Sequence, residues 1–249
     1  MKKGMIDPGH VGHDSGAVGP SGVQERDITL RVARKLADIL RPVMEVRLTR
    51  EDDRSRGLTL NADLQARADA ANDWGADIFV SIHCNSAADR TAHGCEVWTS
   101  RGQTGADELA EAIIKALEAE FPDMTMRKDY ADGDSDKEAG FAVLTRTRMP
   151  AALPELAFIS NPTEEALLES PAYQDRAARA IAEGIAEFLG VQLPAPVPTD
   201  QDAVRIVVAG QVLTGKEIDD RTWAPVRPLA EALGLKVIWN DTAKTVVIE

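Results

Sequence analysis

Cysteine is scarce in this chain of 249 residues, which contains only Cys84 and Cys95. Two cysteines are too few for a disulfide framework, and we expect both to be reduced, buried thiols rather than a pair. Aromatic residues make up only 4% of the sequence, so the core should be mostly aliphatic. A hydrophobic content of 44% and a charged content of 28% are those of a soluble globular protein.

Positive charge is also in deficit, and the net charge is -13. Because binding to a phosphate backbone needs a basic surface, nucleic acid is not expected as a partner. No apolar run approaches the ~20 residues of a transmembrane helix, so no membrane span is expected. Lys2-Lys3 is not followed by the apolar stretch of a signal peptide. We therefore expect synthesis in the cytoplasm without a signal peptide, and release by another route if the protein acts outside the membrane.

Helical and strand-like patterns alternate along the chain. Helices are predicted near residues 28–40, 60–74, 104–120 and 177–189, and strands near residues 44–48, 77–82, 95–99, 141–144 and 153–159. The polar residues 121–140 are predicted to form an exposed loop. This alternation predicts an α/β fold, with a mostly parallel or mixed sheet and helices on both faces.

Three prolines, Pro194, Pro196 and Pro198, divide the chain. We expect a main domain over residues 1–190, a stiff linker over 191–203, and a small C-terminal α+β module over 204–249. The module should contain strands around a turn at Gly210, a helix ended by Gly234, and a final hairpin. Fewer than 50 residues give a marginal core, so we expect the module to lean on the main domain or on a second copy of itself.

Three residues are candidate metal ligands. His10 follows the chain-breaking segment Asp7-Pro8-Gly9, Glu25 precedes a predicted helix, and His83 directly follows a predicted strand. Ligands in such sheets gather at the carboxyl ends of strands. Two histidines and one glutamate are a known ligand set for catalytic zinc, which lowers the pKa of its bound water toward ~7. The alternative is that they are unrelated polar residues near loops.

Glu155 is the candidate catalytic residue, since it lies within the apolar run 153–158. Desolvation there would raise the pKa of its carboxyl group, which suits a general base and acid. The alternative is a structural ion pair with Arg50 or Arg146.

Other polar residues have weaker claims. His13 and His93 are assigned to solvated or supporting roles. Asp7 either orients His10 or simply forms a turn. Asn85 either hydrogen-bonds near the site or caps the strand end.

Several motifs resemble the zinc-dependent N-acetylmuramoyl-L-alanine amidases, a family of bacterial cell-wall amidases and phage endolysins. The resemblance covers roughly residues 1–190. The matching segments are Asp7-Pro8-Gly9-His10, Gly16-Ala17, Gly22 to Glu25, Leu48-Thr49-Arg50, the helix with Arg67, Ser81-Ile82-His83-Cys84-Asn85, Pro150 to Glu155, and Phe158-Ile159-Ser160-Asn161. The pair of glycines usual after the ligand histidine is here Val11-Gly12.

This resemblance implies a twisted sheet of about six strands, with zinc bound by His10, Glu25 and His83. A zinc-activated water would attack the amide carbonyl between N-acetylmuramic acid and L-alanine in peptidoglycan. Glu155, the catalytic glutamate, would take the water proton and pass it to the leaving amine. Residues 121–141 are too few for the inhibitory helix of some family members, so we expect an accessible zinc.

The C-terminal module resembles, more weakly, the copper amine oxidase N-terminal-like domain, through Trp223 to Arg227 and Val237 to Asn240. No His, Cys or Met lies beyond residue 203 to bind copper. We expect wall attachment or homodimerisation, with a stabilising spacer as an equal alternative.

The function that we predict is a peptidoglycan hydrolase, and specifically an endolysin that acts on the cell wall after release. One alternative is a bacterial lysis or wall-remodelling amidase. Others are a zinc peptidase that cuts within the stem peptide and a non-catalytic wall-binding protein.

Overall fold

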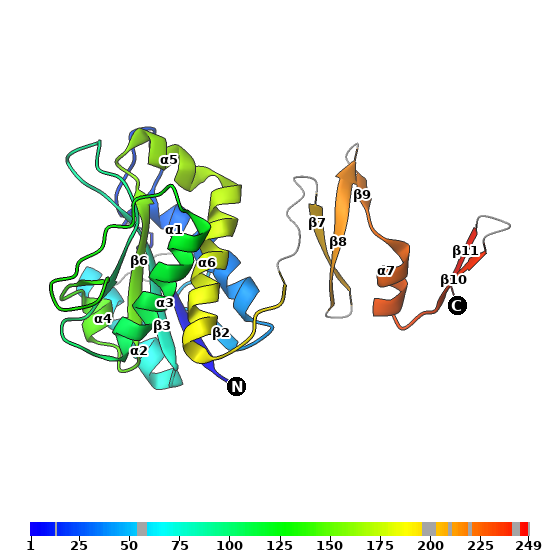
Figure 1. The fold of residues 1–249 in the computed structure, drawn as a ribbon, viewed down its shortest axis with the longest axis horizontal. Coiled ribbons are helices and arrows are strands. Elements are labelled where there is room, and N and C mark those ends of the chain that lie inside the picture. Colours follow the sequence, from blue (N-terminus) through cyan, green and yellow to red (C-terminus); the bar gives the residue numbers. More distant parts are fainter. Residues whose placement is uncertain are drawn as a thin grey trace. The chain divides into compact units, whose positions relative to one another are not determined.

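The computed structural model describes residues 1–12, 14–53, 59–195, 203–208, 211–218, 221–240 and 245–248. The chain divides into two compact units, Met1–Pro194 and Ala195–Glu249. The first unit is built on one sheet of six strands in the order β2-β1-β3-β6-β4-β5 (Figure 1). The strands are β1 (Lys3–Pro8), β2 (Glu45–Leu48), β3 (Ile78–Asn85), β4 (Glu96–Thr99), β5 (Lys137–Glu138) and β6 (Ala151–Phe158).

The sheet is mixed. Strands β2, β1, β3 and β6 pair in parallel, whereas β4 is antiparallel to β6 and parallel to β5. The carboxyl ends of β1 and β3 therefore lie at the same edge of the sheet. The predicted α/β class with a mixed sheet is confirmed.

Helices pack against both faces of this sheet. The larger layer, α1 (Glu25–Leu40), α3 (Gly105–Glu120) and α6 (Pro171–Leu189), is seen in front of the strands in Figure 1. The second layer contains α2 (Leu60–Trp74) and α4 (Ala142–Thr145), which contact each other, and α5 (Pro162–Glu169) packs on α6. Alternate residues of β3 explain the two layers: Val80 joins the larger core, and Phe79 joins a smaller core with residues of α2 and α4.

Three local predictions are wrong. Residues 142–145 form helix α4 instead of a strand, because so short an apolar run does not distinguish the two. His83 lies within β3, which continues to Asn85, rather than after the strand. Residues 121–140 are not all exposed loop, since they include β5 and the buried residues Ser135 and Asp136.

The second unit contains the elements expected of a small α+β module. Strands β7 (Ala203–Val208), β8 (Gln211–Ile218) and β9 (Arg221–Trp223) form an antiparallel sheet, followed by α7 (Val226–Ala232) and the antiparallel pair β10 (Val237–Asn240) and β11 (Thr245–Ile248). The predicted turn residue Gly210 lies outside the described residues. The domain boundaries at residues 190 and 203 stay a prediction.

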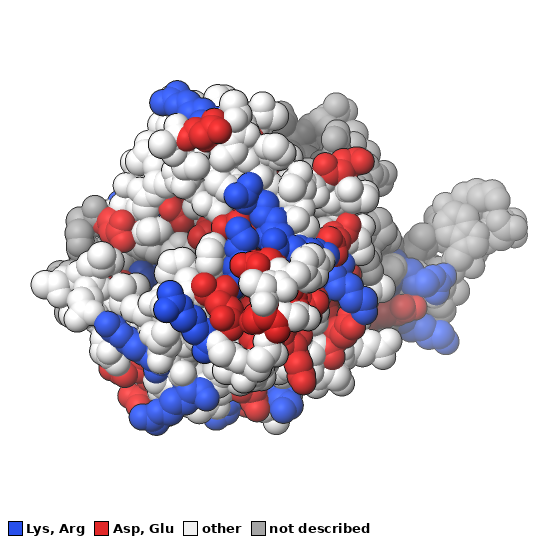
Figure 2. All heavy atoms as spheres, turned by 60° about the vertical axis from the view of Figure 1, so that its left-hand side comes forward, with Lys and Arg blue, Asp and Glu red and all other residues white. Residues whose placement is uncertain are grey.

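Charge is mixed on the surface. On the face shown in Figure 2, Lys and Arg side chains lie among those of Asp and Glu. Exposed pairs such as Lys115–Glu187 contribute at most about 1 kcal/mol each, so stability depends mainly on the two cores. Within the described residues, no helix is long and apolar enough to cross a bilayer.

Candidate metal centre

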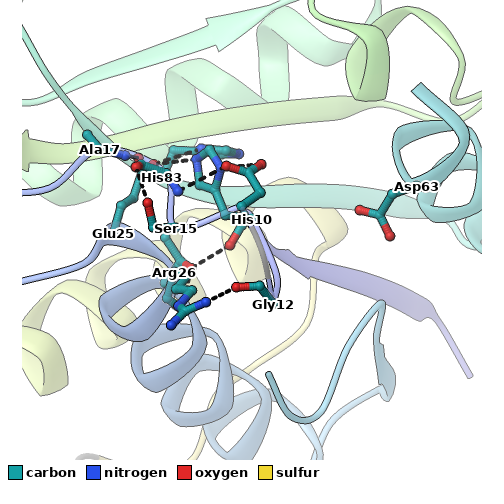
Figure 3. A network of polar contacts seen from close by, with 12 residues as sticks. His10, Gly12, Ser15, Ala17, Glu25, Arg26, Asp63 and His83 are labelled. Carbon is teal, nitrogen blue, oxygen red and sulfur yellow. Dashed lines mark hydrogen bonds and ion pairs between the residues drawn. The ribbon is translucent and has the colours of Figure 1, made fainter. Parts of the chain in front are cut away.

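His10, Glu25 and His83 come together at one edge of the sheet (Figure 3). His10 follows β1, Glu25 is the first residue of α1, and His83 lies near the end of β3. The Oε1 atom of Glu25 is 3.1 Å from Nε2 of His10 and 3.0 Å from Nδ1 of His83. One ligand atom from each residue lies within 4.8 Å of the others, so the three could hold one metal ion.

Close backbone approach explains the glycines around these side chains. A Cβ atom on Gly9 would lie 2.4 Å from the ring of His83. A Cβ atom on Gly16 would lie 2.6 Å from the Glu25 carboxylate, and the φ angle of Gly16 is +64°. His10 itself has a φ angle of 60°, a region that non-glycine residues seldom adopt. The loop geometry therefore specifies how the ligand side chains meet.

Hydrogen bonds orient two of these side chains. Nδ1 of His10 lies 2.9 Å from Oδ2 of Asp14, which leaves Nε2 facing Glu25. Glu25 accepts hydrogen bonds from the backbone N–H groups of Ala17, at 2.9 Å, and Cys84, at 3.0 Å. Such partners fix the orientation of metal-binding side chains. Asp14, rather than Asp7, therefore orients the His10 side chain.

Asp7 instead belongs to a buried polar network. It accepts hydrogen bonds from Ser81 and Thr49 and forms an ion pair with Arg67, whose Nη1 lies 2.8 Å from Oδ1. Arg67 also donates to the main-chain carbonyl of His10 at 3.0 Å. This network positions the backbone at the candidate centre, and within the described residues no hydrogen bond joins the Asp7 and His10 side chains.

The electrostatics of the centre favour a cation. Burial by itself would raise the pKa of Glu25, but hydrogen bonds from His10 and His83 lower it well below its usual range. Burial lowers the pKa of His10, and the nearby Glu25 and Asp14 carboxylates reverse this effect and raise it. An ionised carboxylate beside two imidazoles fits Zn²⁺ in its donor types and charge.

Glu155 lies on β6 in register with His83 of β3 on one side and Glu96 of β4 on the other. Side chains in register on adjacent strands share one face of the sheet, so Glu155 faces the same side as His83. Its Oε2 atom is buried and makes no hydrogen bond within the described part of the chain. Burial, followed by the charges of Glu25 and Glu96, raises the pKa of Glu155 well above its usual value.

The two arginines that could have formed an ion pair with Glu155 hydrogen-bond to other groups instead. Arg50 donates to the main-chain carbonyls of Pro8 and Gly9, and Arg146 donates to Asn61. The raised pKa expected for Glu155 from its apolar surroundings is confirmed, and its catalytic role stays a prediction.

Glu96 was not identified from the sequence. It is 4% exposed, and its carboxylate accepts hydrogen bonds from Asn85, at 2.6 Å, and Lys137, at 2.7 Å. It also pairs with Arg127 at 3.0 Å. Unlike Glu155, Glu96 is thus fully compensated by donors. The sequence signal for Glu96 was its place in the predicted strand near residues 95–99.

His93 is not one of the residues that meet at this centre. His93 is exposed, and its Nδ1 atom lies 3.0 Å from the carbonyl of Thr91. His13 falls outside the described residues. Cys84 and Cys95 are free and buried, as predicted.

Residues 5–187 match the family model described as N-acetylmuramoyl-L-alanine amidase, and residues 210–249 match the copper amine oxidase N-terminal domain. An endolysin of Bacillus phage SPP1 is 36% identical over an alignment of 197 residues, covering 75% of this chain and 66% of the relative. The amidase AmiC of Escherichia coli is 31% identical over an alignment of 222 residues, covering 74% of this chain and 52% of the relative.

The chain thus spans about half of one relative and about two thirds of the other. Among solved structures, the catalytic domain of CwlV, an N-acetylmuramoyl-L-alanine amidase from Bacillus (Paenibacillus) polymyxa var. colistinus, is similar with a TM-score of 0.68 and 36% identity. This likeness covers 77% of the present chain and 100% of the CwlV domain. The resemblance found in the motifs is confirmed, and the chain belongs to the N-acetylmuramoyl-L-alanine amidase family.

Proposed function

We propose that this protein is a peptidoglycan hydrolase that cleaves the amide bond between N-acetylmuramic acid and L-alanine. The observation that carries the proposal is the meeting of His10, Glu25 and His83, with Glu155 in register beside them, in a chain of the amidase family. Zinc is the proposed metal, held by His10, Glu25 and His83. The two imidazoles and one carboxylate leave room in the usual zinc coordination for water or substrate.

Each side chain then has a distinct part in the reaction. Zinc in this site would supply the Lewis acidity that makes water a nucleophile near neutral pH and polarises the scissile carbonyl. Glu155 takes the proton of the attacking water and delivers it to the amine of L-alanine as the C–N bond breaks. The Oε2 atom of Glu155 is buried and has no hydrogen-bond partner within the described residues. Burial raises the pKa of Glu155, so the carboxyl group can both take up and release a proton more easily near neutral pH.

Mass spectrometry of the soluble products from purified peptidoglycan, with zinc supplied, tests this proposal. We expect free stem peptides that begin at L-alanine, together with glycan strands that are intact. Products cut within the stem would instead identify a zinc peptidase. An absence of products, with zinc bound at the centre, would contradict any hydrolase and favour a wall-binding protein.

The cellular role that we propose is that of an endolysin. The similarity to the endolysin of phage SPP1 supports this role, whereas the similarity to AmiC supports a bacterial wall-remodelling amidase. Either role places the site of action at the cell wall. Lysis of host cells when the protein and a membrane-permeabilising agent are supplied together would favour the endolysin.

We further propose a catalytic domain over residues 1–190, a linker over 191–203, and a wall-binding or homodimerising module over 204–249. The family match that ends at residue 187 and the separate match over residues 210–249 support this division. A chain truncated after Gly190 is expected to cleave soluble muropeptides at an unchanged rate and to act more slowly on whole walls. Rates on both substrates and a sedimentation analysis of both proteins measure this. If the truncated chain acted equally on both substrates, and if both proteins sedimented as monomers, the module would neither target the wall nor form dimers.

A further inference from the structure

A second group of carboxylates shares no residue with the candidate zinc centre. Asp107 lies in the first turn of α3, and Asp134 and Asp136 belong to the three residues before β5. One carboxylate oxygen from each of the three lies within 4.8 Å of the others. In the sequence, Asp132, Asp134 and Asp136 are spaced two residues apart, the spacing of the first three ligand positions in a calcium-binding EF-hand loop.

Burial sets this group apart from ordinary acidic surface residues. Asp136 is only 1% exposed and Asp107 only 7%. Oδ2 of Asp136 accepts a hydrogen bond from the hydroxyl of Thr99 at 2.6 Å, but Oδ1 is buried without any hydrogen-bond partner in the described chain. Oδ1 of Asp134 is in the same condition. A buried acceptor without a donor costs free energy, which a ligand at this point would recover.

The donors that do reach the three carboxylates are neutral. Asp107 accepts from the backbone N–H of Thr104 at 2.5 Å, and Asp134 accepts from the side-chain amide of Gln103 at 2.9 Å. Among the ion pairs of the described residues, none joins Asp107, Asp134 or Asp136 to a Lys or Arg. The negative charge of the group is therefore uncompensated by the protein.

The titration of Asp136 agrees with this. Burial and the neighbouring Asp134 and Asp107 carboxylates raise the pKa of Asp136 to about 7, although the hydrogen bond from Thr99 lowers it. A single proton would relieve only part of this repulsion. A divalent cation would compensate all three carboxylates and would also satisfy the two unpartnered oxygens.

We propose that Asp107, Asp134 and Asp136 bind a calcium ion. Calcium takes 6–8 oxygen ligands in flexible geometry, so carboxylates from two separate segments suit it, with water or main-chain carbonyls completing the shell. Magnesium demands near-ideal octahedral geometry and zinc prefers nitrogen or sulfur donors, which this group lacks.

Calcium here would join three parts of the fold. Asp107 belongs to α3, Thr99 ends β4, and Asp134 and Asp136 lead into the edge strand β5. The next residue, Lys137, donates to Glu96 at 2.7 Å, and Glu96 lies in register with Glu155. Calcium would therefore stabilise the connection between α3 and the edge strand β5.

Isothermal titration of the full chain with calcium chloride, after saturation with zinc, tests the proposal. Prior saturation with zinc fills the candidate metal centre, so the heat released on adding calcium reports binding at the Asp107, Asp134 and Asp136 group. We expect one calcium ion per chain. The variants Asp136→Asn and Asp134→Asn should each bind at least about tenfold more weakly, because calcium affinity depends on ligand charge. The matched control Asp123→Asn removes an exposed carboxylate from the same connection and should bind like the wild type.

Thermal unfolding provides a second readout. Millimolar calcium should raise the Tm of the wild type and of Asp123→Asn, and should raise it less in Asp134→Asn. Asp134→Asn is used here because the Asp134 side chain is only half-buried, so the substitution should leave the fold intact. No calcium binding by the wild type would overturn the proposal. Wild-type affinity in both Asp134→Asn and Asp136→Asn would overturn it equally, as would binding of magnesium without calcium.

Discussion

Replacement of Glu155 by glutamine is expected to leave zinc binding intact and to reduce turnover by about 100- to 10,000-fold, the usual contribution of a general acid–base group. Glutamine keeps the size of the side chain but cannot take a proton from water. Glu155 lies in register with His83, yet its Oε2 atom makes no hydrogen bond within the described residues. The substitution should therefore remove a proton acceptor without disturbing the proposed zinc ligands His10, Glu25 and His83.

Zinc content and kcat on a soluble muropeptide, measured on the same preparations, check this expectation. His83→Ala is the contrasting variant and should lose zinc and activity together. Glu169→Gln makes the same chemical change on an exposed part of α5 and should retain both. Near-normal turnover in Glu155→Gln would remove Glu155 from the mechanism, and loss of zinc in that variant would make it a metal-site residue instead.

The main features of the fold could be predicted from the sequence because periodic patterns determine them. Long helices such as α1 and α3 have helical apolar spacing over most of their length, and β3 begins with the continuous apolar run Ile78 to Val80. Helix α4 and strand β5 could not be predicted, since the four residues of α4 fit either pattern and the two residues of β5 are strand only by pairing with β4.

The residues of the candidate site could likewise be predicted only where a local sequence pattern marks them. The sequence could supply four candidate residues because each lies at a predicted strand or helix end, or within an apolar run, and belongs to a short motif. These are His10, Glu25, His83 and Glu155. The partners that orient or compensate the site were missed, because Asp14 and Glu96 act through contacts that exist only in the folded chain. The grouping of Asp107 with Asp134 and Asp136 depends likewise on tertiary structure.

The ion pair between Arg67 and Asp7 is such a tertiary contact, and its disruption is expected to have the largest effect on stability. Arg67 is 3% exposed and Asp7 is 1% exposed. Arg67→Met should lower the free energy of unfolding by about 3–5 kcal/mol at neutral pH, because it leaves the Asp7 carboxylate charged and buried without its cation. The exposed pair Arg41–Asp38 provides a matched control, and Arg41→Met should change stability by about 0.5 kcal/mol or less.

The effect of Arg67→Met should depend on pH in a defined direction. In the wild type, burial would raise the pKa of Asp7, but the charge of Arg67 and hydrogen bonds from Ser81 and Thr49 lower it overall. Asp7 thus stabilises the wild type above its unfolded pKa of about 3.9, and this contribution is lost as the pH falls through the folded pKa. Without Arg67, burial dominates, the folded pKa rises above the unfolded value, and the variant loses stability as the pH increases.

Urea unfolding of the metal-free protein at pH 4 and pH 7 measures this difference, because histidine ligands release zinc when they are protonated at pH 4. The loss of stability caused by Arg67→Met should be large at pH 7 and smaller at pH 4. The double variant Asp7→Asn/Arg67→Met should be more stable at pH 7 than Arg67→Met alone, since it also removes the unpaired charge. Equal destabilisation at both pH values, with no recovery in the double variant, would mean that Arg67 acts through its packing and its hydrogen bonds to backbone carbonyls rather than through the charge of Asp7.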